Sequence, residues 1–253
     1  MILDNSGVRL DGRLLSEYNA ILTAPVEVGE AKPVTSYTDV PGLSGSADLT
    51  LESPDGAAYR TRRSVSLSVA SVGSSEEVAY AKRSIGALVG KVVTVESPDD
   101  FGAWRGRLSV SAWTDFIEEH EDGAYKASTA TVTVNAEPYL ILAEREIQLD
   151  ADATINVLGN TCAWPTLTMA ATSSTPSVTV LNDGADQLKL AYSLTVSDAT
   201  ITANCQKGYS TLKDGSQVFP TIESDYPYLM PGECRFVLSG CTATLRYNPL
   251  VMV

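Results

Sequence analysis

The single histidine of the chain, His120, lies in the sequence EEHED among four acidic residues, Glu118, Glu119, Glu121 and Asp122. A histidine beside carboxylates can act as a general base, and clustered carboxylates can bind calcium. The spacing of these acids does not match an EF-hand loop, and no serine-based triad can be assembled around this histidine. We therefore interpret the segment as a solvated or interfacial hairpin tip.

The other common catalytic signatures are missing from the sequence. It contains no GxSxG nucleophile elbow, no HExxH motif, no P-loop and no dinucleotide-binding fingerprint. Asp99 and Asp100 are adjacent carboxylates in a turn, where adjacency alone does not make an acid-base pair. We predict a protein that is not an enzyme and that uses no cofactor.

The chain has four cysteines, which all fall in its second half: Cys162, Cys205, Cys234 and Cys241. They form no CxxC unit, so we expect no structural zinc. Cys234 and Cys241 could lie near each other across a turn, but a reducing compartment favours free thiols. We interpret all four as small buried apolar residues.

Five aromatic residues of the second half suggest a different kind of chemistry, the stacking of sugar rings. They are Trp164, Tyr192, Tyr209, Tyr226 and Tyr228. Most aromatic residues of a β-sandwich belong to its core, and only the Tyr226-Pro227-Tyr228 cluster has the pattern of an exposed site. A carbohydrate-binding module that contacts host-surface glycans through Tyr226 and Tyr228 is therefore an alternative hypothesis.

The composition excludes other partners. The formal net charge is -13, and neither half of the chain carries the basic surface that phosphate binding requires. We therefore expect no direct binding of nucleic acid. No apolar run approaches the ~18–20 residues that span a bilayer, and the N-terminus lacks the pattern of a signal peptide. We expect no contact with a membrane, and a protein that is made in the cytoplasm.

Strand patterns dominate the first half of the chain. Apolar and small polar residues alternate, as in half-buried antiparallel strands, over 64–69, 91–96, 107–113 and 128–135. One segment differs: Ser74 and Glu77 have the spacing of a capping box, and apolar residues then recur at helical intervals. Those residues are Val78, Ala81, Ile85, Leu88 and Val89, followed by Gly90 as a stop. We predict one amphipathic helix that covers a sheet.

The second half is almost purely strand and turn. Eight short strand patterns follow residue 154, separated by Asn-Asp-Gly, Lys-Asp-Gly and Pro-Gly turns, which is typical of a sandwich or jelly roll. The chain is therefore predicted to be mainly β with two domains. Residues 1–145 form a sandwich-like or barrel-like domain with the helix, residues 146–253 form a jelly-roll sandwich, and 142–150 connects them.

The segment TDVPGLSGSADLTLESPDGAAYRTRRSVSL is the most distinctive part of the chain. Gly42 and Gly45 would supply positive φ angles or a close backbone approach in a loop. Asp48 could pair with Arg62 or Arg63 and hold that loop in place. The alternative is an ordinary glycine-rich hairpin with an exposed carboxylate.

This segment resembles the signature of the distal tail proteins of long-tailed bacteriophages. The matching positions are Pro41, Gly42, Gly45, Asp48 and Leu49, with Arg63 opening the next strand. The helix followed by LVGKVVTV, the WRGRL strand, the EPY segment and the late LMPGECRFVLSG segment continue the resemblance. Leu43-Ser44 stands where the family has Arg-Asp, and Cys234 replaces a usual asparagine.

The resemblance implies an assembly protein of the virion tail tip, assembled in the cytoplasm of a bacterial host. It implies a hexameric ring formed by the N-terminal domain and a galectin-like C-terminal domain that projects outward. The implied partners are other copies of the chain, the tail tube protein and the tail-associated lysin or hub protein. As a candidate ring interface we single out the hairpin that carries Phe116, Glu118, Glu119, His120 and Glu121.

Overall fold

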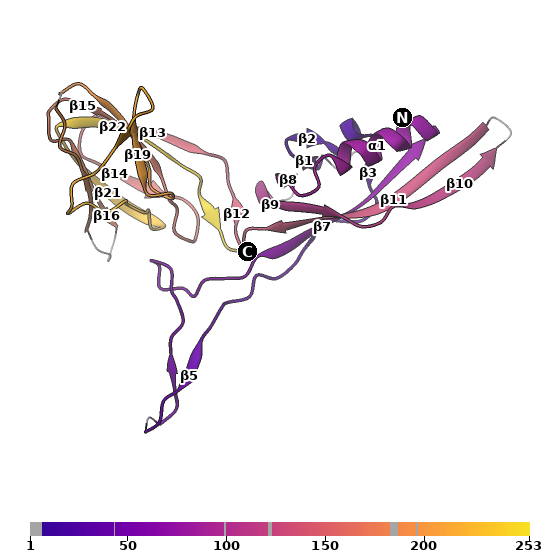
Figure 1. Cartoon of the computed structure of the whole chain (residues 1–253), viewed down its shortest axis with the longest axis horizontal. Helices are drawn as coiled ribbons and strands as arrows, with labels where there is room; N and C mark the ends of the chain where they lie inside the picture. Colours follow the sequence, from indigo (N-terminus) through magenta and orange to yellow (C-terminus); the bar gives the residue numbers. More distant parts are fainter. Residues whose placement is uncertain (1–6, 43, 99, 121–122, 183–186, 196) are drawn as a thin grey trace. The chain divides into compact units, whose positions relative to one another are not determined.

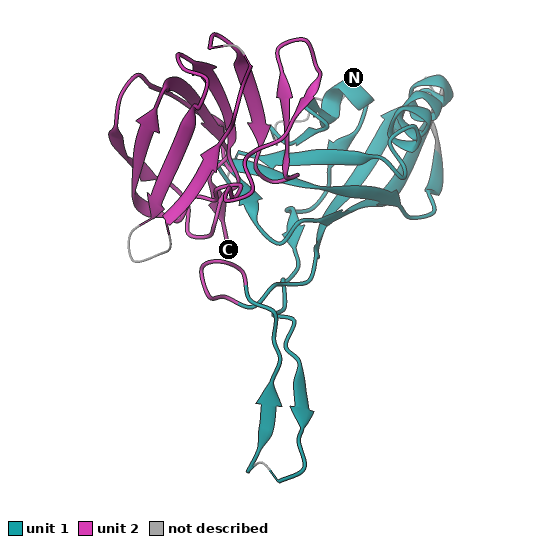
Figure 2. Cartoon of the chain, turned by 60° about the vertical axis from the view of Figure 1, so that its left-hand side comes forward, with its two compact units in different colours: residues 1–52, 58–141, 253 teal, residues 53–57, 142–252 magenta. Residues whose placement is uncertain are grey.

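The computed structural model describes residues 7–253 except 43, 99, 121–122, 183–186 and 196, and the side chains of 118–125 also lie outside the description. The chain is mainly β and divides into two compact units (Figure 2). Unit 1 comprises Met1–Glu52, Ala58–Ile141 and Val253, and unit 2 comprises Ser53–Ala57 and Leu142–Met252. The domain boundary after residue 145 remains a proposal from the sequence.

Unit 1 is built on one antiparallel sheet, with strand order β2-β1-β8-β9-β11-β7-β3 (Figure 1). Three further strands join this path: β10 pairs with β11, β12 with β9 and β4 with β7. The strands are β1 (Arg9–Leu10), β2 (Arg13–Leu14), β3 (Ile21–Leu22), β4 (Glu27–Val28), β7 (Arg63–Gly73), β8 (Val92–Ser97), β9 (Gly102–Val110), β10 (Thr114–His120), β11 (Gly123–Ala136) and β12 (Leu140–Ile141). A short 3-10 helix, η1 (Leu15–Tyr18), follows β2.

The predicted amphipathic helix is α1 (Ser75–Gly86), and it packs against β7 and β11. The capping box is confirmed: Ser74 accepts a hydrogen bond from the amide of Glu77, and the Glu77 side chain accepts one from the amide of Ser74. The alternating valines and leucines of β7 and β11 and the buried face of the helix form one core. The helix ends before Leu88 and Val89, which lie in the turn that follows, so their assignment to the helix is wrong.

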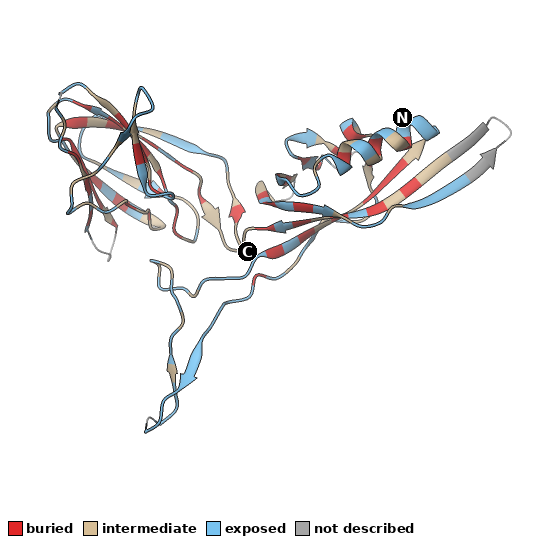
Figure 3. Ribbon diagram, viewed as in Figure 1, coloured by how far each residue is buried: buried red, intermediate tan, exposed pale blue. Residues whose placement is uncertain are grey.

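Between β4 and β7 the chain leaves the sheet and forms an arm, residues 29–62. The arm contains the two-stranded sheet of β5 (Tyr37–Asp39) and β6 (Ser46–Asp48), which stands out as a separate limb in Figure 1. Nearly all of its residues are exposed (Figure 3). A side loop, residues 53–57, branches from the returning limb and is grouped with unit 2.

Unit 2 is formed by two antiparallel sheets. The six-stranded sheet has the order β13-β22-β15-β18-β19-β20, and the four-stranded sheet has the order β14-β21-β16-β17. The strands are β13 (Arg145–Leu149), β14 (Ala153–Val157), β15 (Thr166–Ala171), β16 (Ser177–Asn182), β17 (Gln187–Ala191), β18 (Thr200–Asn204), β19 (Tyr209–Leu212), β20 (Gln217–Val218), β21 (Gly232–Ser239) and β22 (Cys241–Tyr247), with a short β23 (Leu250–Val251) after them. Segment 142–150, which we predicted as a connection, therefore supplies a strand of the larger sheet.

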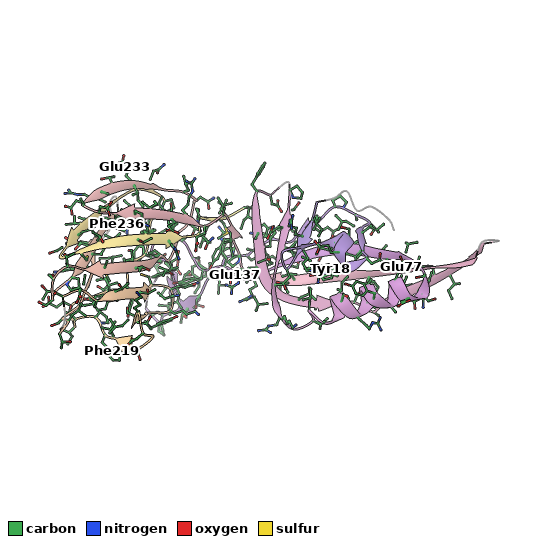
Figure 4. All side chains as sticks on the ribbon, turned by 90° about the horizontal axis from the view of Figure 1, so that it is seen from above. Tyr18, Glu77, Glu137, Phe219, Glu233 and Phe236 are labelled. Carbon is green, nitrogen blue, oxygen red and sulfur yellow. The ribbon has the colours of Figure 1, made fainter. Side chains whose placement is uncertain are left out.

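One hydrophobic core joins the two sheets of unit 2. Buried residues of both sheets, among them Leu167, Met169, Val180 and Phe236, belong to the same cluster, and Figure 4 shows Phe236 among the strands. All four cysteines are buried free thiols, as predicted, and burial raises the pKa of Cys205 and of Cys234 to about 12. Two packed antiparallel sheets with a shared interior make this unit a β-sandwich.

Candidate functional site

The arm places apolar side chains on one of its faces. The register pairs Thr38 with Ala47, and the amide of Leu49 donates to the carbonyl of Ser36 at 2.8 Å. Because side chains alternate along a strand, Ala47, Leu49 and Leu51 share one face. The first limb of the arm, which leads from Val34 into β5, alternates in the same way and puts Val34 on that face.

A second pairing brings Tyr59 to the same face. The amide of Val34 donates to the carbonyl of Tyr59 at 2.7 Å, and the amide of Tyr59 donates to the carbonyl of Leu51 at 3.3 Å. These three residues are therefore cross-strand neighbours where the arm branches. We call Val34, Leu49, Leu51 and Tyr59 the apolar arm face; their exposed fractions are 51%, 59%, 76% and 53%.

The opposite face of the arm carries one exposed aromatic residue, Tyr37, among polar groups that hydrogen-bond to one another. Ser46 donates its hydroxyl to the carboxylate of Asp39 at 2.6 Å, and Asp48 accepts the amide of Thr50 at 2.9 Å. The hydroxyl and amide of Thr50 lower the pKa of Asp48 below its usual range. The arm thus has one apolar and one mainly polar face, and no second layer formed by the described residues of this unit covers the apolar face.

A two-stranded hairpin without a covering layer is at best marginally stable in water. The root of the arm is fastened, because the amide of Thr61 donates to the carbonyl of Lys32 at 2.8 Å and the amide of Gly29 donates to that of Ser64 at 2.7 Å. Beyond this root, four large exposed apolar side chains lie close together. Exposed apolar patches of this kind mark protein interaction sites.

The side loop of the arm is held by Asp55. This carboxylate accepts the hydroxyl of Ser53, the amide of Ala57 at 3.2 Å and the hydroxyl of Thr161 at 3.0 Å. Burial opposes ionisation of Asp55, but the hydrogen bonds outweigh it and lower its pKa. Burial, and next the charge of Asp55, raise the pKa of the neighbouring Cys162 thiol to about 11. Cys162 is therefore an unreactive thiol at neutral pH.

The residues singled out by the glycine motif are not gathered in one place. Pro41, Gly42 and Gly45 lie in the turn of the arm, where both glycines have positive φ, at 89° and 104°. Asp48 lies on β6 within the arm. Arg63 is the first residue of β7, is only 4% exposed and packs on the ring of Trp104 with 4.8 Å between the guanidinium carbon and the ring centre.

The predicted pairing of Asp48 with an arginine is wrong. Asp48 bonds Thr50, whereas Arg63 Nη2 donates to the carbonyl of Val253 at 3.0 Å, and Arg62 Nη1 donates to that of Asn135 at 3.2 Å. The physical reason is that the side loop separates the limb of Asp48 from the start of β7. Burial, and next the charge of Arg60, lower the pKa of Arg63.

The predicted hairpin is formed by β10 and β11. Phe116 and Ile117 are both exposed, and as neighbours in a strand they lie on opposite faces. Glu118, Glu119 and His120 lie on β10, but their side chains are outside the described part of the structure, and Glu121 lies outside the described residues altogether. The candidate interface at this tip therefore remains a proposal.

The root of this hairpin is tied to the helix by Asp115. Its carboxylate lies 2.5 Å from Lys82 Nζ on α1 and 3.6 Å from Lys126 Nζ, and it accepts the hydroxyl of Ser128 at 2.5 Å. The hydrogen bond from Lys82, followed by that from Ser128, lowers the pKa of Asp115 to about 2. Asp115 therefore links β10 to both α1 and β11.

We expect Asp115→Asn to lower the midpoint of urea unfolding at pH 7. Because the pKa of this group is lower in the folded state, its stabilisation is present above the unfolded value near 3.8 and disappears as the pH falls through about 2. The difference between variant and wild type in urea midpoints should therefore vanish at pH 2. Asp150→Asn, at an exposed position, is the control, and a difference that stays constant from pH 7 to pH 2 would contradict the prediction.

The five aromatic residues considered for sugar stacking are divided between the core and the surface of unit 2. Tyr192 is buried, and its hydroxyl lies 2.6 Å from that of Ser210, which lies 3.1 Å from that of Tyr226. The hydroxyl of Tyr226 is therefore hydrogen-bonded within unit 2. Tyr228 and Trp164 form an edge-to-face pair with ring centres 5.7 Å apart. Only part of the predicted set is therefore available at the surface.

The sequence reasoning missed the apolar arm face. The signal was present in SADLTLE, where Ala47, Leu49 and Leu51 alternate with polar residues. Such a pattern predicts a strand with one apolar face. The glycines and charges that surround it are typical of a loop and obscure this alternation.

Comparison with known proteins bears on both units. Residues 158–250 match the family described as siphovirus-type tail component, C-terminal domain. The Dit (gp 19.1) protein of phage SPP1, described as a paradigm of the hub adsorption apparatus in phages that infect Gram-positive bacteria, has the same fold. The match has a TM-score of 0.64 at 14% identity and covers 96% of this chain and 98% of that one. The C-terminal part of the chain therefore matches a siphovirus-type tail component, and the chain as a whole shares the fold of the SPP1 Dit protein.

Two structures of the baseplate of phage P2 are also similar, in the activated conformation with Ca and with Sr. Each is 10% identical; the TM-scores are 0.46 and 0.44, with 92% and 94% of this chain covered and 91% and 97% of the other. No curated protein sequence matches this chain. Among the described residues, no helix is long and apolar enough to cross a membrane.

The match of residues 158–250 to a siphovirus-type tail component indicates a protein of a phage tail. The resemblance predicted from the glycine motif and the strand order is confirmed at this level. The mainly β fold with one α-helix is confirmed as well. Among the features described above, the apolar arm face is the clearest candidate for an interaction surface.

Proposed function

We propose that this chain forms a closed ring of six copies at the tail tip and joins the tail tube to the baseplate or tail-associated lysin. The apolar arm face carries this proposal, because an arm with one uncovered apolar face is suited to lie against the next copy. In a closed ring each interface is heterologous, so that one patch meets a different patch on the neighbour. An arm that extends from its own sheet is such a patch.

Three further parts of the proposal follow from the same assembly. Residues 1–145 would form the ring, with the β10–β11 hairpin as a second contact, and the galectin-like domain of residues 146–253 would project outward. With a net charge of -13, an acidic lumen would repel passing DNA and would not bind it. Assembly would take place in the cytoplasm of the bacterial host.

The ring proposal is tested by replacing Leu49 and Leu51 together with serine. Burial of a leucine side chain contributes about 2 kcal/mol, so we expect each interface to weaken at least ~30-fold. Light scattering and electron microscopy should show six-fold rings for the wild type, alone or with the tube or hub protein, and monomers for the variant. Tyr37→Ser, on the polar face of the same hairpin, is the control.

Two outcomes would count against the proposal. If the doubly substituted protein still formed rings, the arm would not be part of the ring interface. A wild-type protein that stays monomeric with both the tube and the hub protein would contradict the ring itself. Specific binding of glycans by that monomer, lost on replacement of Tyr228, would instead favour the carbohydrate-binding alternative.

A further inference from the structure

The root of the arm gathers positive charge in a chain whose net charge is -13. Its two limbs, residues 29–33 and 58–64, carry four basic residues and one acidic residue, which are Lys32, Arg60, Arg62, Arg63 and Glu30. The bridge between Glu52 and Ala58 brings a second carboxylate to this place. Four basic groups against two acidic groups leave a local balance of +2, and we call the three arginines the arm-root cluster.

Among the described residues, no carboxylate pairs with the arm-root cluster. Arg60 Nη1 donates to the carbonyl of Ala31 at 3.2 Å, and Arg62 Nη1 donates to that of Asn135 at 3.2 Å. Neither of these residues nor Arg63 forms an ion pair with a described acidic side chain. Because Arg60 and Arg62 are exposed, a partner can reach both of them.

Arg63 adds a buried positive charge to the same place. It is only 4% exposed, and its Nε atom has no hydrogen-bond partner among the described residues. Burial, and next the charge of Arg60, lower the pKa of Arg63, because like charges at close range oppose each other. Glu137 does not relieve this repulsion, since its carboxylate lies 3.8 Å from Arg105. Guanidinium groups bind carboxylates through two parallel hydrogen bonds, so the arm-root cluster has the chemistry of a carboxylate site.

The cluster lies at one end of a long two-stranded ribbon. The strands β7 and β11 pair from Arg63, the first residue of β7, to Gly73, its last. The 11 residues of β7 span about 33 Å, and the β10–β11 hairpin extends the ribbon past Gly73 (Figure 1). A ribbon paired over this length keeps its two ends apart, so the far end of one copy can reach the arm root only in another copy.

The far end of the ribbon carries the opposite charge. The run of residues 118–122, which we call the acidic tip, contains four acidic residues and one histidine in sequence. Two lysines at the base of this hairpin, Lys82 and Lys126, lie 2.5 Å and 3.6 Å from the carboxylate of Asp115. Their charge is therefore already directed at Asp115, and the acidic tip brings four carboxylates to the end of the ribbon.

Opposite charges at opposite ends of one unit favour a second copy as the partner. A contact between two different patches is heterologous, and such contacts close into rings. Each copy can then present its tip to one neighbour and its arm root to the other. Nucleic acid is a poorer occupant of the arginines, because the net charge of -13 repels it.

We propose that the acidic tip of one copy binds the arm-root cluster of the next copy, with Arg60 and Arg62 as the residues that contact the carboxylates. The proposal rests on the ring proposed above and identifies the two surfaces that meet at each of its interfaces. A contact of this kind is electrostatic, so the rings should dissociate more readily as the salt concentration rises.

The test reverses the two charges in separate full-length proteins. The root variant carries Arg60→Glu and Arg62→Glu, and the tip variant carries Glu118→Lys and Glu119→Lys. Light scattering and electron microscopy follow assembly under the conditions in which the wild type forms rings, alone or with the tube or hub protein. We expect each variant by itself to associate about 100-fold more weakly, because it places like charges against each other.

The control substitutes two exposed lysines of unit 2, Lys207→Glu and Lys213→Glu. This protein has the same net charge as the root variant, and we expect it to form rings like the wild type. Thermal unfolding followed by circular dichroism shows which variants are folded.

An equal mixture of the root and tip variants gives the sharper result. The reversed tip of one fits the reversed root of the other, while the remaining tip and root have their native charges. We therefore expect the mixture to restore rings in which the two variants alternate, as an even number of copies permits. Native mass spectrometry of proteins with different tags should find equal numbers of each.

The outcomes separate this contact from the ring itself. Rings formed by either folded variant alone, or a mixture of folded variants that forms none, would overturn the contact and leave the ring in place. A wild type that forms no rings even with the tube and hub proteins would contradict the proposed function and this contact together.

Discussion

Replacing Gly106 with alanine should destabilise unit 1 by about 3 kcal/mol, the upper end of the cost of overpacking. A Cβ atom at this position would lie 2.2 Å from the carbonyl oxygen of Asn135 and 2.5 Å from the Cα atom of Ala136. Both are backbone atoms of β11, the strand that pairs with β9 here. A flexible side chain could move aside, but the backbone of a central strand cannot move without breaking its pairing.

The matched control is Gly86→Ala at the end of α1. A Cβ atom there meets nothing within 4 Å, and alanine is the better helix former, so we expect a gain of about 0.5 kcal/mol. Urea unfolding of both variants, followed by tryptophan fluorescence, separates the two cases. Equal stability of the Gly106 and Gly86 variants would show that β9 and β11 do not approach each other as closely as described.

The second large effect is expected for Trp104→Ala, at about 4 kcal/mol, because truncation of a buried aromatic residue to alanine costs about 3–5 kcal/mol. Trp104 is fully buried on β9, its indole N–H donates to the carboxylate of Asp100 at 3.1 Å, and its ring lies under the guanidinium of Arg63. The substitution leaves a cavity, and it also removes the aromatic ring on which the buried guanidinium of Arg63 packs. Chemical unfolding followed by circular dichroism measures the loss.

Arg63 provides the control for this prediction. Its Nε atom has no hydrogen-bond partner among the described residues, so hydrogen bonds offset only part of the cost of burying the guanidinium. Replacing a buried charge with an apolar side chain of similar length is often neutral, and we expect Arg63→Met to change stability by less than about 1 kcal/mol. A double-mutant cycle of the two positions should give a coupling of about 0.5–1 kcal/mol from the cation-π contact.

Much of the fold was predictable because its signals are local. The capping box of Ser74 and Glu77 and the alternation in β7 and β11 act over a few residues, and the structure follows both. The buried cysteines follow from their apolar surroundings. The end of α1 was misjudged because Leu88 and Val89 keep the helical spacing, while the chain already turns toward β8.

The candidate surfaces were harder to predict because they depend on pairing between distant residues. Asp48 and Arg63 are only 15 positions apart in the sequence. The side loop of residues 53–57 lies between them along the chain, and their side chains bond to different partners. Burial of Tyr192 follows the expectation that most aromatic residues of a sandwich belong to its core, and the call on Tyr226 and Tyr228 stays a prediction.

The side loop of the arm also has a consequence for the order of events during synthesis. Asp55 is translated 106 residues before Thr161, the side chain that donates to it. A nascent chain that ends before Thr161 can already form the bonds that Ser53 and Ala57 donate to Asp55, but it lacks the third. The side loop therefore gains its last hydrogen bond only when the second half of the protein has been made, long after the rest of its contacts have become possible.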